Sequence, residues 1–225
     1  MAKTNSIMVV AISICLINSG CRKDGNTTDV SKPSQGASGI VYTNIDPDSV
    51  ILKANSSSFA LDLNHDGITD FTFYCNNSFC GDGLMAPIVP YVYFSLRASS
   101  NGNMIMTNVT PTPPLLTLAA VFDSATRIDP DSSWSIDPQY LLYGAAHIGY
   151  IRCMKAYGYW QKAEDKYIGA KFVKDNNTFY GWIRLSSTYS ITDPPYRHLS
   201  SGQIIIKDYA YNSSAGQYIL AGQTK

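Results

Sequence analysis

The stretch 62–70, DLNHDGITD, places oxygen-bearing residues at alternate positions of one short segment. Calcium is a hard cation that takes about six to eight oxygen ligands, and alternate residues of a tight loop can turn several oxygens inward together. Gly67 follows the third of these positions and permits the sharp bend that such a loop needs. We therefore predict a structural calcium site whose ligands are four side chains and one backbone carbonyl: Asp62, Asn64, Asp66, the carbonyl of Ile68, and Asp70.

The flanking runs 58–62 and 71–74, SFALD and FTFY, place this loop between two strands. The twelfth loop position is Phe73, where a helix–loop–helix calcium hand has a bidentate glutamate. The string DxNxDGxxD instead resembles calcium loops between strands in dockerin-like and thrombospondin-like extracellular repeats. The missing ligand at the twelfth position implies weak calcium binding, with a dissociation constant of roughly 10⁻⁴ to 10⁻³ M. Two alternatives stay open: a metal-free β-turn, since Asn, Asp and Gly form turns anyway, and a catalytic role.

The start of the chain is an export signal rather than part of a fold. Its apolar run 7–17, IMVVAISICLI, has the length of a signal-peptide core and is too short to span a bilayer as a helix. Small residues Ser19 and Gly20 precede Cys21, an order that resembles a bacterial lipoprotein signal. The resemblance implies cleavage before Cys21, lipid on its sulfur, and a membrane anchor. An ordinary secretory signal is the alternative.

Three segments follow from this: a lipoprotein signal peptide over 1–20, a flexible tether over 21–38, and one β-sandwich domain over 39–225. The tether is polar, with scattered Gly, Pro, Ser and Thr, and cannot bury enough apolar surface to fold. Net charge is zero and charged residues make up 15% of the chain, without a basic stripe, so we expect no nucleic-acid partner.

Two cysteines lie close together in the predicted domain. Cys75 and Cys80 bracket two turn-forming asparagines, and an exported location favours a local disulfide between them. The alternative is two free thiols. Cys153 has no evident partner and is expected to be buried as a small apolar residue.

Short β-rich runs separated by Gly, Pro, Asn and Asp fill the rest of the chain, a pattern typical of an all-β fold. We predict an antiparallel, jelly-roll-like β-sandwich with strands at 40–42, 50–52, 58–62, 71–74, 91–98, 104–109, 167–173, 179–185, 203–211 and 217–220. The run 115–122, LLTLAAVF, is ambiguous between a buried strand and a short helix.

The clearest element is a hairpin of 167–173 and 179–185 around the turn 175–177, DNN. Alternation assigns the second strand two faces. One face carries Phe179, Gly181, Ile183 and Leu185, and the other carries Tyr180, Trp182 and Arg184. Tyr180 and Trp182 are expected to pack across strands rather than contact a ligand.

The strings KYIGAKFVKDNNTFYGWIRL, IIIKDYAYN and ILAGQ, within about 165–222, resemble a segment of uncharacterised exported bacterial surface proteins and lipoproteins. In these, a hairpin ending in Tyr-Gly-Trp-x-Arg-Leu precedes a strand with an acidic residue and Ala-Tyr. Some carry the sorting tail called PEP-CTERM. The resemblance implies an exported β-sandwich and no particular activity.

The sequence contains none of the catalytic motifs that we sought. His65, His147 and His198 lack metal-ligand spacing, and neither a nucleophile elbow nor a phosphate-binding loop occurs in the sequence. We therefore expect a non-enzymatic binding or scaffold protein of the bacterial cell envelope, held at the outer membrane by the lipid on Cys21, with a glycan or an envelope protein as partner.

Two other functions remain open. The first is a carbohydrate-binding lipoprotein of a glycan-uptake system, in which exposed rings such as Trp134, Tyr159 and Trp160 would stack on sugars. The second is a glycoside or peptide hydrolase, which needs two acids, or a nucleophile and a base, converging in one pocket.

Overall fold

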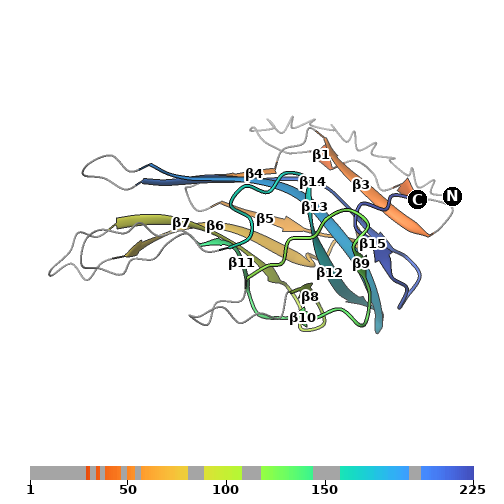
Figure 1. Cartoon of the computed structure of the whole chain (residues 1–225). Helices are drawn as coiled ribbons and strands as arrows, with labels where there is room; N and C mark the ends of the chain where they lie inside the picture. Colours follow the sequence, from red (N-terminus) through yellow and green to blue (C-terminus); the bar gives the residue numbers. More distant parts are fainter. Residues whose placement is uncertain are drawn as a thin grey trace, which may run out of the picture.

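The computed structural model describes residues 29–30, 34–35, 39–46, 50–53, 57–80, 89–107, 118–143, 158–192 and 199–225 (Figure 1). Every regular element in these ranges is a β-strand, and every strand pairing is antiparallel. The predicted all-β, antiparallel class is confirmed. Within the same ranges, we find no helix with the length and apolar character needed to cross a bilayer.

The larger sheet has a continuous strand order β1-β3-β14-β13-β12-β8-β10. Two further strands join at its sides, where β2 pairs with β3 and β4 pairs with β14. The bounds are β1 Asp29–Val30, β2 Ser34–Gln35, β3 Ile40–Asp46, β4 Val50–Lys53, β8 Met104–Met106, β10 Trp134–Ser135, β12 Lys166–Lys174, β13 Asn177–Thr192 and β14 Leu199–Asn212.

A smaller sheet has the order β11-β7-β6-β5, and a separate pair joins β15 to β9. The bounds are β5 Ser57–Leu61, β6 Phe71–Cys80, β7 Val89–Ala98, β9 Arg127–Ile128, β11 Gln139–Tyr143 and β15 Ile219–Leu220. Strands β5 to β7 and β12 to β14 pair in chain order as meanders. A jelly roll is built from Greek keys, so these pairings do not support the jelly-roll-like detail of the prediction.

The two sheets share one hydrophobic core. Ile183 and Leu185 of the larger sheet and Phe73 and Leu96 of the smaller sheet belong to the same buried cluster, and each is fully buried. Burying one such side chain contributes roughly 1.5–3 kcal/mol. This shared core is consistent with the predicted sandwich.

The β12–β13 hairpin forms where the sequence predicts it. Lys174 pairs with Asn177, and the turn residues Asp175 and Asn176 have φ angles of 49° and 60°. These are left-handed values that Asp and Asn tolerate better than most residues. The assignment of side chains to the two faces of β13 also holds, because Ile183 and Leu185 belong to one buried cluster and Tyr180 and Trp182 to another.

The second face of β13 is buried as well, which the sequence prediction did not include. Trp182 packs in a cluster with Ile128 of β9 and Ile219 of β15, and its indole Nε1 donates a hydrogen bond to the Gln223 carbonyl at 3.1 Å. The C-terminal segment therefore covers the outer face of the larger sheet. Tyr180 and Trp182 are packing residues, as expected, with exposed fractions of 5% and 1%.

The predicted tether over 21–38 is not free along its whole length. Asp29 and Val30 pair with Asp46 and Ile45, and Ser34 and Gln35 pair with Tyr42 and Val41. These four residues fall within the predicted tether, which was inferred from its low apolar content alone. Backbone groups of a polar segment can pair with the open edge of a sheet whatever its side chains are.

The predicted Cys75–Cys80 disulfide does not fit strand β6. Both residues lie in this one extended strand, where Cys75 pairs with Phe94 and Cys80 with Val89 of β7. Five extended residues span about 16 Å, whereas a disulfide needs Cα atoms within about 7 Å. The predicted Cys75–Cys80 disulfide is therefore incompatible with strand β6. The two asparagines between the cysteines continue the strand instead of turning it.

Candidate functional site

The acidic loop 62–70 connects β5 to β6 and is organised by its own side chains. Asp62 accepts hydrogen bonds from the backbone N–H groups of Asp66 and Gly67, at 3.2 and 2.7 Å. Asn64 Oδ1 accepts from the same Asp66 N–H at 3.0 Å, and Asp66 Oδ1 accepts from the Ile68 N–H at 2.9 Å. Side-chain oxygens of the first three predicted ligands thus gather around one tight turn.

Asp70, the last predicted ligand, has a different role. Its side chain is buried, Oδ2 accepts a hydrogen bond from the Leu63 N–H at 2.9 Å, and Oδ1 accepts one from Asn103 Nδ2 at 3.1 Å. Burial raises the pKa of Asp70 from 3.8 to about 6. Asn103 Oδ1 also accepts from the Val173 N–H. Asp70 and Asn103 together fasten the loop to β12.

His65, which lies in the middle of the loop, fastens it to β3 and β14. Its Nε2 lies 3.0 Å from Thr43 Oγ1 and 3.1 Å from the Tyr209 hydroxyl, and its ring stacks on the ring of Tyr209. Burial raises the pKa of Tyr209. Loop attachments therefore reach three strands of the larger sheet, although the loop itself connects two strands of the smaller one.

The loop can offer a cation the side chains of Asp62, Asn64 and Asp66. A carboxylate oxygen that accepts one hydrogen bond keeps a second lone pair, so these internal bonds leave coordinating capacity. Lys174 Nζ lies 3.6 Å from Asp66 Oδ2 and supplies a positive charge next to the loop. Among the described residues, no three His, Cys, Asp or Glu side chains come together in a metal-holding group.

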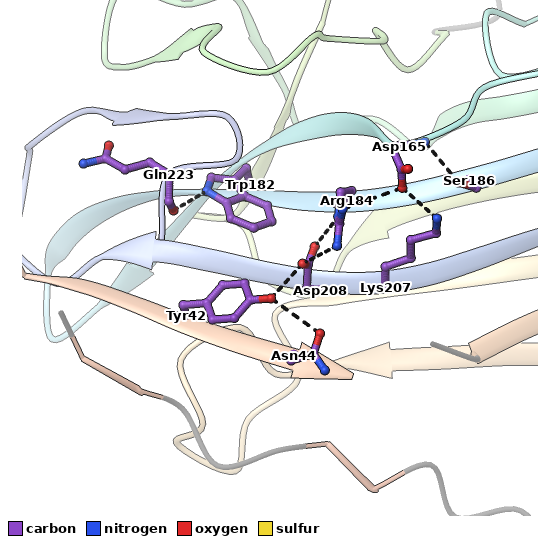
Figure 2. A network of polar contacts seen from close by, with 9 residues as sticks. All are labelled: Tyr42, Asn44, Asp165, Trp182, Arg184, Ser186, Lys207, Asp208 and Gln223. Atoms are coloured by element: carbon purple, nitrogen blue, oxygen red, sulfur yellow. Dashed lines mark hydrogen bonds and ion pairs between the residues drawn. The ribbon is translucent and has the colours of Figure 1, made fainter. Parts of the chain in front are cut away.

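A second polar cluster, which the sequence analysis did not single out, lies on the outer face of the larger sheet (Figure 2). The Arg184 guanidinium donates two hydrogen bonds to Asp208, and the Tyr42 hydroxyl donates to the same carboxylate at 2.9 Å. Lys207 donates to Asp165 at 2.6 Å, and Arg184 lies 3.7 Å from that carboxylate. Two cations and two carboxylates alternate, so the cluster is internally neutralised.

The charges of this cluster affect one another's protonation. The hydrogen bond from Lys207 lowers the pKa of Asp165. The hydrogen bonds to Asp208 raise the pKa of Arg184. Asp165 therefore stays ionised and Arg184 stays protonated near neutral pH, and the cluster joins β3, β13 and β14 through its hydrogen bonds.

The three aromatic residues considered for sugar stacking are not equivalent. Trp160 is fully buried in the main core, so its ring cannot meet a sugar. Trp134 is half-buried, packs against Tyr180 with ring centroids 5.6 Å apart, and has Lys171 above its ring. Tyr159 is 48% exposed. The structure therefore does not bring these rings together as one exposed platform.

Several predicted positions lie outside the described residues: Cys21 and the signal peptide 1–20, Cys153, His147 and His198. Asn103 and the Arg184–Asp208 pair are the interacting groups that sequence reasoning missed. Alternation did place Arg184 on the face now seen to carry the cluster. Its partner, Asp208, lies in the DYAY string that the sequence analysis quoted. The register between β13 and β14 that places Asp208 opposite Arg184 cannot be read from a single sequence.

The chain was compared with known proteins in three ways. No protein-family model matches it, and neither the curated proteins nor the solved structures contain a match.

Proposed function

We propose that this protein is a lipid-anchored protein of the bacterial cell envelope whose β-domain has a binding or scaffold role without catalysis. The observation that supports it is the order of segments: a signal-like apolar run, Cys21 at its end, a polar stretch, and then an all-β domain. Acyl chains on Cys21 would hold the domain at a membrane surface. Partners would be a glycan or another envelope protein.

Mass spectrometry of the mature protein tests the anchor. We expect an N-terminal Cys21 that carries acyl chains, and loss of membrane association in a Cys21→Ser variant. A Cys15→Ala variant is a matched control, because this cysteine lies within the predicted signal and should be removed with it. An unmodified mature N-terminus, or equal membrane association of the Cys21→Ser variant, would disprove the anchor.

We also propose that the acidic loop binds calcium for a structural purpose. The support is the convergence of Asp62, Asn64 and Asp66 around one turn, together with attachments from His65 to the larger sheet. Bound calcium would offset the repulsion between the loop carboxylates and would hold β5 and β6 at this end of the domain. Because the buried Asp70 is turned to Leu63 and Asn103, we assign it to loop attachment instead of coordination.

A further inference from the structure

The turn between β7 and β8 contains the one Asn–Gly dipeptide of the sequence, Asn101–Gly102. These two residues occupy the central positions of a β-turn, which is closed by a hydrogen bond from the Asn103 N–H to the Ser100 carbonyl at 3.1 Å. The Asn101 side chain is exposed, and it makes no hydrogen bond with any residue that the structure describes. The side-chain amide of Asn101 is therefore open to chemical attack.

The backbone nitrogen of Gly102 is the group next to that amide. An asparagine side chain and the following backbone nitrogen can close a five-membered ring, and a glycine at the following position leaves the approach free of a side chain. Within the described part of the chain, the Gly102 N–H donates no hydrogen bond. In the dipeptide Asp66–Gly67 the corresponding N–H donates to Asp62 Oδ2 at 2.7 Å, so that nitrogen is already engaged.

Packing requires glycine at position 102. A Cβ atom there would lie 2.8 Å from Cγ2 and 2.9 Å from Cβ of Val173. Val173 is itself held in place on β12, because its N–H donates a hydrogen bond to Asn103 Oδ1 at 3.1 Å. A bulkier residue at position 102 would overpack this contact, so the fold keeps the residue that obstructs attack on Asn101 least.

We propose that Asn101 is a self-modifying residue that converts, without an enzyme, to aspartate and isoaspartate. The Gly102 nitrogen loses its proton and forms a bond to Asn101 Cγ, the Cγ–Nδ2 bond breaks, and ammonia leaves. Water then adds to either carbonyl of the resulting succinimide and opens the ring to aspartate or to isoaspartate. Nothing is oxidised or reduced, and the side chain changes from neutral to negatively charged.

The isoaspartate product lengthens the main chain by one carbon in a turn that is anchored at both ends. The Ser99 N–H donates to the Asp70 carbonyl at 2.9 Å, and Asn103 Nδ2 donates to the same carbonyl at 3.1 Å. Asn103 Nδ2 also donates to the Asp70 carboxylate. The longer main chain has to strain or break one of these bonds, so isoaspartate at position 101 weakens the attachment of the acidic loop to β12.

The first test incubates the full chain at pH 6 and at pH 8.5 and follows each asparagine by peptide mapping. Conversion raises the mass of a peptide by about 1 Da, and electron-transfer fragmentation separates isoaspartate from aspartate. Asn176 and Asn177 are internal controls, because both are exposed at the β12–β13 turn and are followed by residues with side chains. We expect Asn101 to convert at least about tenfold faster than either control, a difference of about 1.4 kcal/mol in activation free energy, and to convert faster at the higher pH.

The second test measures thermal unfolding before and after incubation at pH 8.5. The wild type should lose stability on incubation, whereas an Asn101→Gln variant should not, because glutamine closes a less favourable six-membered ring. A freshly purified Asn101→Asp variant carries the new charge without the extra main-chain carbon, and it should melt like the fresh wild type. The proposal is overturned if Asn101 converts no faster than Asn176 and Asn177, if Asn101→Gln loses as much stability as the wild type, or if fresh Asn101→Asp is as unstable as the incubated wild type.

Discussion

Arg184 and Asp208 form a two-bonded ion pair between neighbouring strands, with Nε 2.8 Å from Oδ1 and Nη2 2.7 Å from Oδ2. The Asp208 side chain is 4% exposed and that of Arg184 is 29% exposed. A register shift follows this pair, because Leu185 opposes Ile206 and leaves Lys207 without an opposite residue. The resulting bulge allows Lys207 to reach Asp165, so one irregularity of β14 organises both ion pairs.

Replacing Arg184 with alanine should lower the free energy of unfolding by about 3 kcal/mol, because it leaves the buried Asp208 carboxylate without its cation. Urea unfolding monitored by circular dichroism measures this change. Lys166→Ala is the control, since it removes an exposed ion pair with Asp123 and should cost less than about 1 kcal/mol. Equal effects of the two variants would contradict a buried role for the Arg184–Asp208 pair.

Gly181 should not tolerate a side chain. A Cβ atom there would lie 2.7 Å from the Ala210 carbonyl oxygen, 3.0 Å from Leu63 Cδ2 and 3.1 Å from Tyr211 Cβ. Because a backbone atom cannot move aside easily, Gly181→Ala should destabilise the fold by about 1–3 kcal/mol. Thermal and urea unfolding test this. Thr188→Ala, at an exposed position of the same strand, is the control and should change stability by less than about 0.5 kcal/mol. A Gly181→Ala variant with an unchanged free energy of unfolding would refute the prediction.

Asp70 should give the fold a specific pH dependence. Its pKa is raised to about 6 by burial, so between about pH 4 and 6 the folded protein holds a proton that the unfolded chain has lost. Stability from this group is therefore highest at low pH and falls as the pH rises, by up to about 1.4 kcal/mol per pH unit.

Urea unfolding at pH 4.5, 5.5 and 6.5 compares the wild type with Asp70→Asn. The wild type should gain stability relative to the variant as pH falls through this window, whereas parallel profiles would contradict the prediction. The contribution of Asp129 to the pH dependence of stability has the opposite sign, because the hydrogen bond from Arg127 lowers the pKa of Asp129. Its stabilisation is lost below about pH 4, outside the window of Asp70.

Calcium should raise the melting temperature of the wild type and leave that of an Asp62→Ala, Asp66→Ala variant unchanged. With a dissociation constant of about 1 mM, 10 mM calcium adds about 1.4 kcal/mol. Because Asp62 also caps two backbone N–H groups of the loop, the readout is the calcium increment, not the absolute melting temperature. An Asp123→Ala, Asp131→Ala variant is the control and should retain the increment. Identical increments in all three chains would exclude the site.

The antiparallel all-β class and the 166–185 hairpin could be predicted because their signals are local. Alternation in YIGAKFV and FYGWIRL sets two faces, and Asp175 and Asn176 accept the positive φ angles of the turn. In the acidic loop, Asp62, Asn64 and Asp66 gather as their spacing predicts, because the bonds that position them join residues at most five apart.

Three features that the sequence did not reveal depend on contacts between distant segments. Trp160 was considered as an exposed ring under the carbohydrate-binding alternative, but it packs inside the core shared by both sheets. Asp70 was predicted to coordinate a metal, and its carboxylate accepts a hydrogen bond from Asn103, which lies 33 residues away. Asp29–Val30 and Ser34–Gln35 lie within the predicted tether, and they pair with β3.

By itself, the sequence determined which runs are extended, which residues share a strand face, and where the chain turns, since these depend on side-chain alternation and on the φ preferences of Asn, Asp and Gly. Only the tertiary structure decided that both faces of β13 are buried, that Arg184 meets Asp208, and that β1 and β2 pair with β3. Those outcomes depend on strand order and register, which arise from the summed packing and hydrogen bonding of segments far apart in the chain.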